Sequence, residues 1–282
     1  EQKMDDDDDL KMDTKKKKQK QSVTDDDDRF ASLTNRFENH VCVVTGGGRG
    51  IGQSIALRLA QEGGIVYILD KLRWKETVQL LNDTYGDNKT KCDGMRCDVT
   101  DEKQVTKCIE SIIDSHGYID VLINAVAQLD DGSKHSHEVS IDELQKSMNK
   151  NFYGFFNVSK VVLPYMKSEE YGRIVNIASI NGKEGRAKHF CHSISTAALI
   201  AGTKTMGKEY AGTGVTVNCV APLVDYQVKQ LGKQQAKKET KNIPMGRAAE
   251  ESELAGLVAF IASEENTYTT GFCYDLSGGY TI

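Results

Sequence analysis

Short apolar runs rich in β-branched residues alternate with segments of helical periodicity from residue 40 onward. The segments between them, such as 51–63 and 101–117, place apolar residues three and four positions apart and have glycine near their ends. Nearly continuous apolar strands separated by helices are what a parallel sheet covered on both faces requires. We therefore predict an α/β fold, a Rossmann-like doubly wound parallel sheet, with strands at 40–45, 65–70, 93–99, 119–125, 172–179 and 214–221.

The first 29 residues differ from the rest of the chain, because an acidic block, a basic block and a second acidic block follow one another. Such a segment has too few apolar side chains to offset its ordering entropy, so we expect it to be disordered in isolation. It is either a solvated tail or an arm that docks on a partner of opposite charge pattern. We predict a charged extension over residues 1–35 and a single domain over residues 36–282.

The composition argues against several classes of function. A formal charge of −5 over 282 residues gives no surplus of basic side chains for phosphate recognition, so we predict no nucleic-acid partner. No apolar run approaches the roughly 20 residues of a bilayer span. Seven cysteines without a CxxC pair indicate a reducing intracellular compartment. The first residue, Glu1, is compatible with a cleaved presequence, and we expect the mitochondrion.

A glycine-rich turn follows the first strand, where Thr45 precedes glycines at 46, 50 and 52 and a helix begins. Glycine lets the backbone turn tightly and approach a pyrophosphate, and the helix N-terminus offers free N–H groups. Asp70 ends the next strand 18 residues after Gly52, near where an acid would bind an adenosine ribose. The turn either binds a dinucleotide or persists only to join strand and helix.

This glycine spacing resembles that of the short-chain dehydrogenase/reductase family, and further motifs recur in family order up to the C-terminus. CDVTD at 97–101 resembles the segment that faces the adenine, and LINAVA at 122–127 resembles the family's Leu-Val-Asn-Asn-Ala-Gly strand. VNCVAPL resembles the segment that closes over the nicotinamide, and TGFCYDLSGGYTI the last strand. The local sequence of these motifs most resembles that of reductases of the 3-oxoacyl-carrier-protein and sugar-alcohol type. The resemblance implies about seven strands in the order 3-2-1-4-5-6-7.

The resemblance also implies an NAD or NADP site. Asp70 favours NAD, because a carboxylate binds ribose hydroxyls and repels a 2′-phosphate, while the nearby Arg49, Lys71 and Arg73 leave NADP open. The implied cofactor-binding positions are Thr45, Gly46, Arg49, Gly50, Ile51, Gly52, Asp70, Asp98, Val99, Asn124, Ala127 and Pro222.

Only two of the four catalytic residues that the resemblance implies are present in this sequence. Ser179 and Asn151 stand at the family's serine and asparagine positions, but His192 and Thr196 replace its tyrosine and lysine. In the family the tyrosine transfers the substrate proton, and the lysine holds the nicotinamide ribose and lowers the tyrosine pKa. An imidazole titrates in a suitable range, so His192 is an alternative acid, although nothing replaces the lysine.

Three further departures accompany this loss. Ala125 and Ala127 replace the second asparagine and the glycine of the strand motif, and Ala127 adds a methyl group where backbone approaches cofactor. Leu223 replaces the glycine after Pro222, and Gln227 stands where the family has a threonine. Residues 229–242, in the substrate-lid region, are mostly charged.

The sequence thus predicts a catalytically inactive family member that serves as a structural or regulatory subunit of a larger assembly. The charged arm and the late helices are its expected contacts with other subunits, and a homo-oligomer is also compatible. The alternatives are an active NAD(P)-dependent oxidoreductase that uses His192 with Ser179, and a sensor that holds the nucleotide without turnover. We predict no metal site, because His189, Cys191 and His192 sit too close together for tetrahedral coordination and His135 and His137 suit a solvated loop.

Overall fold

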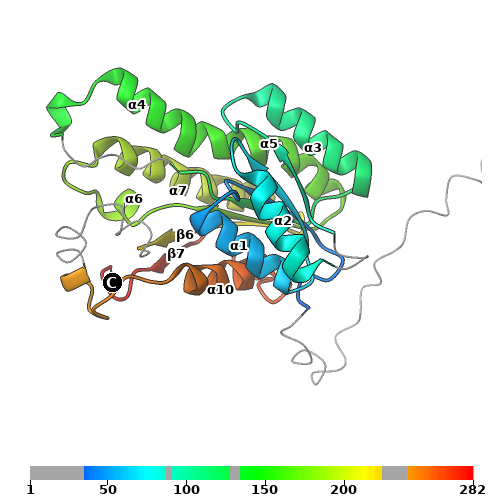
Figure 1. Ribbon diagram of the computed structural model, residues 1–282. Helices are drawn as coiled ribbons and strands as arrows, with labels where there is room; N and C mark the ends of the chain where they lie inside the picture. The colour runs from blue at the N-terminus through cyan, green and yellow to red at the C-terminus, as the bar shows by residue number, and fades with distance from the viewer. Residues whose placement is uncertain (1–34, 87–90, 128–133, 224–239, 282) are drawn as a thin grey trace, which may run out of the picture. The chain divides into compact units, whose positions relative to one another are not determined.

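The computed structural model describes residues 35–86, 91–127, 134–223 and 240–281. Within these residues seven parallel strands form one sheet in the order β3-β2-β1-β4-β5-β6-β7, which confirms the predicted fold (Figure 1). The six strands predicted from local sequence patterns each begin and end within three residues of the predicted bounds. The strands are β1 Val41–Thr45, β2 Ile65–Asp70, β3 Asp93–Arg96, β4 Val121–Asn124, β5 Gly172–Ile177, β6 Val215–Pro222 and β7 Cys273–Leu276.

The strand order reverses at β1, which pairs with β2 on one side and with β4 on the other. Thr45, the last residue of β1, lies opposite Leu69 of β2 and Asn124 of β4. Ligands of open α/β sheets bind beyond the carboxyl ends of the strands at such a reversal. The register therefore places the candidate site just beyond Thr45 and Asn124.

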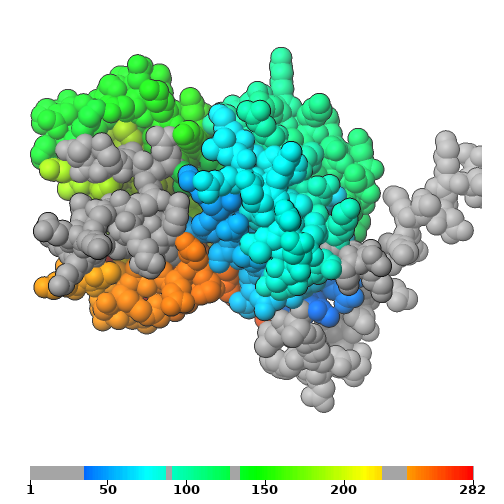
Figure 2. Space-filling view, viewed as in Figure 1, coloured from blue at the N-terminus to red at the C-terminus, as the bar shows by residue number. Residues whose placement is uncertain are grey.

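Helices cover both faces of the sheet (Figure 1). Side chains of α1, α2 and α10 pack on one face together with one set of strand residues, and side chains of α3, α5 and α7 pack on the other. Figure 2 shows α1 and α2 in blue and cyan and α10 in orange on the same side of the domain. The helices are α1 Gly50–Gln61, α2 Trp74–Tyr85, α3 Glu102–His116, α4 Ile141–Met148, α5 Gly154–Ser168, α6 Asn181–Glu184, α7 Phe190–Tyr210 and α10 Glu251–Ala262, with a 3₁₀ turn η2 Ser136–Glu138 and a π-turn η3 Asn149–Tyr153.

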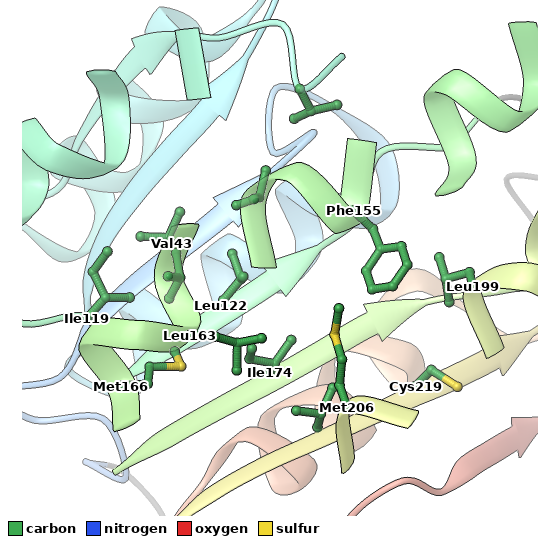
Figure 3. Packing of buried hydrophobic residues seen from close by; sticks show 14 of the residues in the cluster. Val43, Ile119, Leu122, Phe155, Leu163, Met166, Ile174, Leu199, Met206 and Cys219 are labelled. Atoms are coloured by element: carbon green, nitrogen blue, oxygen red, sulfur yellow. The ribbon is translucent and has the colours of Figure 1, made fainter. Parts of the chain in front are cut away.

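The strands are buried on both faces because neighbouring side chains enter different apolar layers. In β1, Val43 joins the layer of α3, α5 and α7, whereas Val44 joins the layer of α1, α2 and α10. Figure 3 shows the first layer, where Val43, Leu122 and Ile174 meet side chains of α5 and α7. Both valines are fully buried. This double burial explains why the strands are almost continuously apolar.

The described chain begins at the amino end of the sheet. The Phe37 N–H donates to the Glu62 carbonyl at 2.9 Å, and the Arg36 guanidinium binds the Glu62 carboxylate at 2.6 and 2.8 Å. Burial alone would raise the pKa of Glu62, but the hydrogen bonds from Arg36 and Arg58 lower it. Residues 36 and 37 are thus fixed at the edge opposite to the carboxyl ends of the strands.

Helix α1 depends on a glycine where it leaves the loop after β1. A Cβ atom on Gly52 would lie 2.3 Å from the Gly46 carbonyl oxygen, which is closer than any real contact. By contrast, a Cβ on Gly256 of the neighbouring helix α10 would meet only the Arg58 guanidinium, at 3.5 Å. The two positions form a matched pair for testing the loop.

We expect Gly52→Ala to lower the free energy of unfolding by about 2 kcal/mol or more, because backbone cannot yield as a flexible side chain can. Gly256→Ala should leave it unchanged or raise it by up to about 1 kcal/mol, because alanine is the better helix former. Urea denaturation of both variants measures the difference. Equal stabilities would contradict the close approach of α1 to the loop.

Candidate functional site

The loop between β1 and α1 has a conformation that only glycine adopts easily. Gly46 and Gly50 have φ values of +66° and +56°, in the left-handed region. Together with the tight contact at Gly52, these values require glycine at all three positions that the sequence singled out. Thr45 Oγ1 donates to the Ile123 carbonyl at 3.4 Å, so it ties the end of β1 to β4. Ile51 is half-buried in the first turn of α1.

Asp70 braces this loop from the end of β2. Its Oδ2 accepts from the Gly48 N–H at 3.2 Å, and its Oδ1 accepts from the N–H groups of Leu72 and Arg73 at 2.8 and 3.3 Å. A Cβ on Gly48 would lie 2.8 Å from the Asp70 carboxyl carbon. The carboxylate that the sequence predicts as a ribose ligand therefore already has a structural role.

Lys71 forms an ion pair with Asp98, the acid at the predicted adenine position. Lys71 Nζ lies 2.5 Å from Asp98 Oδ2, while Asp98 Oδ1 accepts from the Thr100 N–H and hydroxyl. Burial would raise the pKa of Asp98, but these hydrogen bonds lower it. Of the three cations near the loop, Arg49 and Arg73 are exposed, and neither has an acidic partner among the described residues as Lys71 does. Val99 is buried.

The end of β4 closes against the glycine loop. Asn124 Nδ2 donates to Asn176 Oδ1 at 2.9 Å and to Ser159 Oγ at 3.2 Å, so the side chain is held inside the sheet. A Cβ on Gly46 would lie 3.0 Å from Val126 Cγ2. Ala125 and Ala127 were singled out from the sequence, but Val126 was not. Val126 stands where the same motif has the smaller alanine. Ala127 itself is exposed.

Asn151 sits in the π-turn η3 at the centre of a buried polar cluster. Its Nδ2 donates to Ser195 Oγ at 2.9 Å and to Ser147 Oγ at 3.2 Å, and the two serine oxygens are 3.0 Å apart. His192 Nδ1 lies 3.5 Å from the same Nδ2. All four side chains are almost completely buried. Ser147 and Ser195 were not predicted, although both are polar residues on otherwise packed helix faces.

The two replaced positions lie on the first turns of α7 and are turned inward. His192 is 1% exposed and Thr196 is 2% exposed. Thr196 Oγ1 donates to the His192 carbonyl at 2.7 Å, within its own helix. A Cβ on Gly182 would lie only 2.7 Å from this hydroxyl, so α6 lies directly against position 196. The structure thus brings His192 and Asn151 together but offers no cation at position 196.

Ser179 has a local role at the end of β5. Its Oγ accepts from the Asn181 N–H at 3.2 Å, and its carbonyl accepts from the Gly182 N–H at 3.0 Å. Both contacts shape the first turn of α6. Ser179 is 4% exposed.

Leu223 follows Pro222 at the end of β6 and packs inward. It lies against Ile243 and Ala248, and its N–H donates to the Leu276 carbonyl at 2.9 Å. Leucine at this position therefore contributes to packing. Gln227 and most of the segment 229–242 lie outside the described residues, so those two predictions stay predictions.

Other candidate sites carry no ligand set. In the parts of the chain that the structure describes, no group of three His, Cys, Asp or Glu side chains is arranged to hold a metal ion. His135 and His137 are exposed and stack at 6.0 Å on the turn η2. Nor does any helix among the described residues have the length and apolar character for crossing a membrane.

A separate hollow of about 430 Å³ lies on the outer side of η3 and α5. None of the predicted site residues borders it. Its lining residues are Thr100, Glu102, Asn149, Phe152, Tyr153, Phe156, Asn157 and Lys160.

Comparison with known proteins decides the family. A sequence model described as "Enoyl-(Acyl carrier protein) reductase" matches residues 46–281. The chain belongs to the short-chain dehydrogenase/reductase family. It is 34% identical over 254 residues to a 2-dehydro-3-deoxy-L-rhamnonate dehydrogenase (NAD(+)) from Sphingomonas sp., covering 88% of this chain and 98% of the relative. It is 33% identical over 249 residues to a 3-oxoacyl-acyl-carrier-protein reductase from Thermotoga maritima, covering 88% and 100%.

Two solved structures share the fold of this short-chain dehydrogenase/reductase. An NAD⁺-bound xylitol dehydrogenase has a TM-score of 0.78 at 29% identity and covers 88% of this chain and 100% of its own. An actinorhodin polyketide ketoreductase variant with NADPH has a TM-score of 0.77 at 29% identity, covering 86% and 97%. By descent the chain therefore belongs to a family of NAD(P)-dependent oxidoreductases.

The residues fit the two ends of such a dinucleotide unequally. The glycine turn and the start of α1 keep the shape that admits a pyrophosphate, and Asp70 and Asp98 stand at the adenosine end. At the nicotinamide end, position 196 carries a neutral hydroxyl that is bound within its own helix. A nicotinamide cofactor would supply the hydride, but Thr196 is too short and carries no charge to bind the nicotinamide ribose.

We expect restoration of both family residues, His192→Tyr with Thr196→Lys, to produce no NADH or NADPH oxidation with a β-ketoacyl thioester or a ketose. A lysine at 196 must displace α6, because Gly182 already lies against the threonine. The double variant should also unfold at lower urea concentration than Thr196→Ser, the conservative control. A stable double variant with turnover would show that only two side chains separate this protein from an enzyme.

Proposed function

We propose that this short-chain dehydrogenase/reductase is catalytically inactive and serves as a structural or regulatory subunit of a larger assembly. The observation that carries the proposal is the environment of Thr196, a buried, neutral side chain at the position of the family's lysine. The lysine has two tasks in the family, and a threonine hydroxyl performs neither. It carries no charge to lower the pKa of an acid, and it is too short to reach a ribose.

The loss of a positioned acid typically costs a factor of about 10² to 10⁴ in rate. Here that loss is combined with the loss of the ribose contact, with Val126 beside the glycine loop and with a Ser179 hydroxyl that already accepts from the Asn181 N–H. These features support the proposal because each removes a different requirement of hydride transfer.

Binding of a nucleotide through its adenosine end remains part of the proposal. The glycine turn supports it, and Asp70 favours NAD over NADP, because its carboxylate would repel a 2′-phosphate. Lys71 offers little compensation for that repulsion, since it is paired with Asp98.

The proposed contacts with other subunits are the charged arm and the late helices. Phe190 and Ile194, one turn apart on α7, are 38% and 43% exposed, and Phe260 on α10 is 38% exposed. Apolar side chains grouped on a surface mark interaction sites more often than isolated ones do. A reducing compartment, with the mitochondrion as our proposal, fits the seven free cysteines.

One observation favours the active alternative. Asn151 Nδ2 can donate to His192 Nδ1, at 3.5 Å, in place of its 3.2 Å bond to Ser147; the ring proton then lies on Nε2, where an N–H can act as an acid. In this alternative His192 replaces the tyrosine and acts with Ser179.

Turnover assays with the full chain separate the two functions. We expect no oxidation of NADH or NADPH above the enzyme-free rate with β-ketoacyl thioesters, ketoses or aldehydes. Turnover that disappears in His192→Ala but persists in Ile194→Ala, the exposed neighbour outside the polar cluster, would replace our proposal with the active alternative.

Co-purification tests the subunit role. From cells that express it naturally, the tagged full chain should be recovered with other proteins in stoichiometric amounts. A chain without residues 1–34 should lose them, as should one with a neutral Gly/Ser arm of equal length, while keeping the same melting temperature. Recovery of the full chain only as an assembly of its own copies would contradict the proposal.

A further inference from the structure

Two cysteines face each other across the last pair of strands. Cys219 of β6 and Cys273 of β7 are register partners, so their Cα atoms lie directly opposite in neighbouring strands. Strands pair at about 4.8 Å, and disulfides join Cα atoms that are about 4.4 to 6.8 Å apart. Register partners also point to the same side of the sheet, and both side chains belong to the layer of α3, α5 and α7. Figure 3 shows Cys219 in this layer. The two thiols share a hydrogen bond.

The side of β7 that carries Cys273 holds charged groups of both signs. Asp275 lies two residues further on, so it shares this face, and it binds Lys183 Nζ at 2.5 Å. The hydrogen bond from the Cys219 thiol lowers the pKa of Cys273 against the effect of burial. The Lys183 and Lys204 ammonium groups lower this pKa further, whereas the Asp275 carboxylate raises it. Cys273 is therefore the member of the pair that forms a thiolate more readily.

Solvent exposure also favours Cys273 as the member of the pair that reacts first. It is 8% exposed, the largest value among the seven cysteines, and it follows Phe272, which is 53% exposed. Cys219 is fully buried behind it. A slightly exposed thiol paired with a fully buried one is the arrangement of an oxidised and a resolving cysteine.

We propose that Cys273 and Cys219 form a redox-active dithiol, which a peroxide converts into a disulfide between β7 and β6. The Cys273 thiolate attacks the peroxide, so an S–O bond forms while the O–O bond breaks and hydroxide leaves. The Cys219 sulfur then attacks the Cys273 sulfenic acid, forming the S–S bond and expelling the oxygen, which takes up the Cys219 proton as water. Two thiols and one hydrogen peroxide thus give one disulfide and two waters. This inference does not depend on the proposed function.

A second pair provides an internal comparison. Cys97, just after β3, shares a hydrogen bond with Cys108 of α3, whose sulfur also lies 3.9 Å from the Arg96 carbonyl. This pair joins a loop to a helix, and no strand register fixes its Cα atoms. We expect it to stay reduced under conditions that oxidise Cys219 and Cys273.

The test treats the reduced full chain with a small excess of hydrogen peroxide, then denatures it and alkylates the remaining thiols. We expect five alkylated cysteines instead of seven, and a proteolytic fragment in which the peptides of Cys219 and Cys273 are joined. Because the crosslink restricts the unfolded chain, the oxidised protein should melt at least about 3 °C higher until a reductant is added. Cys191→Ser, a buried control, should behave like the natural chain, whereas Cys273→Ser should leave Cys219 reduced, and Cys219→Ala should form no crosslink and leave Cys273 as a sulfenic acid that a dimedone probe traps.

Three results would overturn the proposal. The first is seven alkylated cysteines after treatment. The second is a sulfinic acid at Cys273 with Cys219 still alkylated. The third is a crosslink between Cys97 and Cys108 in place of the expected one. Each can be seen in the natural chain by mass spectrometry, so the test stands even if a variant fails to fold.

Discussion

The two apolar layers against the faces of the sheet hold every other feature of this protein in position. Val43 and Val44 of β1 enter different layers, and the same alternation continues through the central strands. Almost none of the side chains in these layers belongs to the family's chemistry. The driving force for folding therefore depends little on which side chains stand at positions 192 and 196.

The candidate site obeys a different constraint, since buried polar groups must find hydrogen-bond partners. Asn151 donates to Ser195 and Ser147 and lies near His192, while Thr196 binds the backbone of its own helix. Ser179 supports the start of α6. Asn151, Ser147 and Ser195 are thus engaged with one another, and Thr196 and Ser179 with nearby backbone. A lysine at position 196 would bring a charge into this closed set of contacts without a carboxylate to balance it.

Local patterns were enough to predict the strands, most helix positions and the need for glycine at 46, 50 and 52, because strand burial and backbone turns depend on neighbouring residues. The roles of individual polar side chains were not predictable in this way. These roles depend on distances between the ends of neighbouring strands. Examples are the contacts of Asp70 with Gly48, of Lys71 with Asp98 and of Val126 with Gly46. The π-turn at Asn151 leaves no pattern in the sequence, since its residues also suit an ordinary α-helix. Ser179 matched the family serine, but only the structure revealed its contact with α6.

The central claim is that the scaffold and the adenosine end of the site are kept while the nicotinamide end is lost. Calorimetry with ADP and with NADH tests it directly, because ADP carries the adenosine and the two phosphates of NADH but lacks the nicotinamide and its ribose. The account predicts that both ligands bind, with dissociation constants within about threefold of each other. Binding of NADH more than tenfold tighter, or about 1.4 kcal/mol more favourable, would show that the nicotinamide end is still held and would contradict the account.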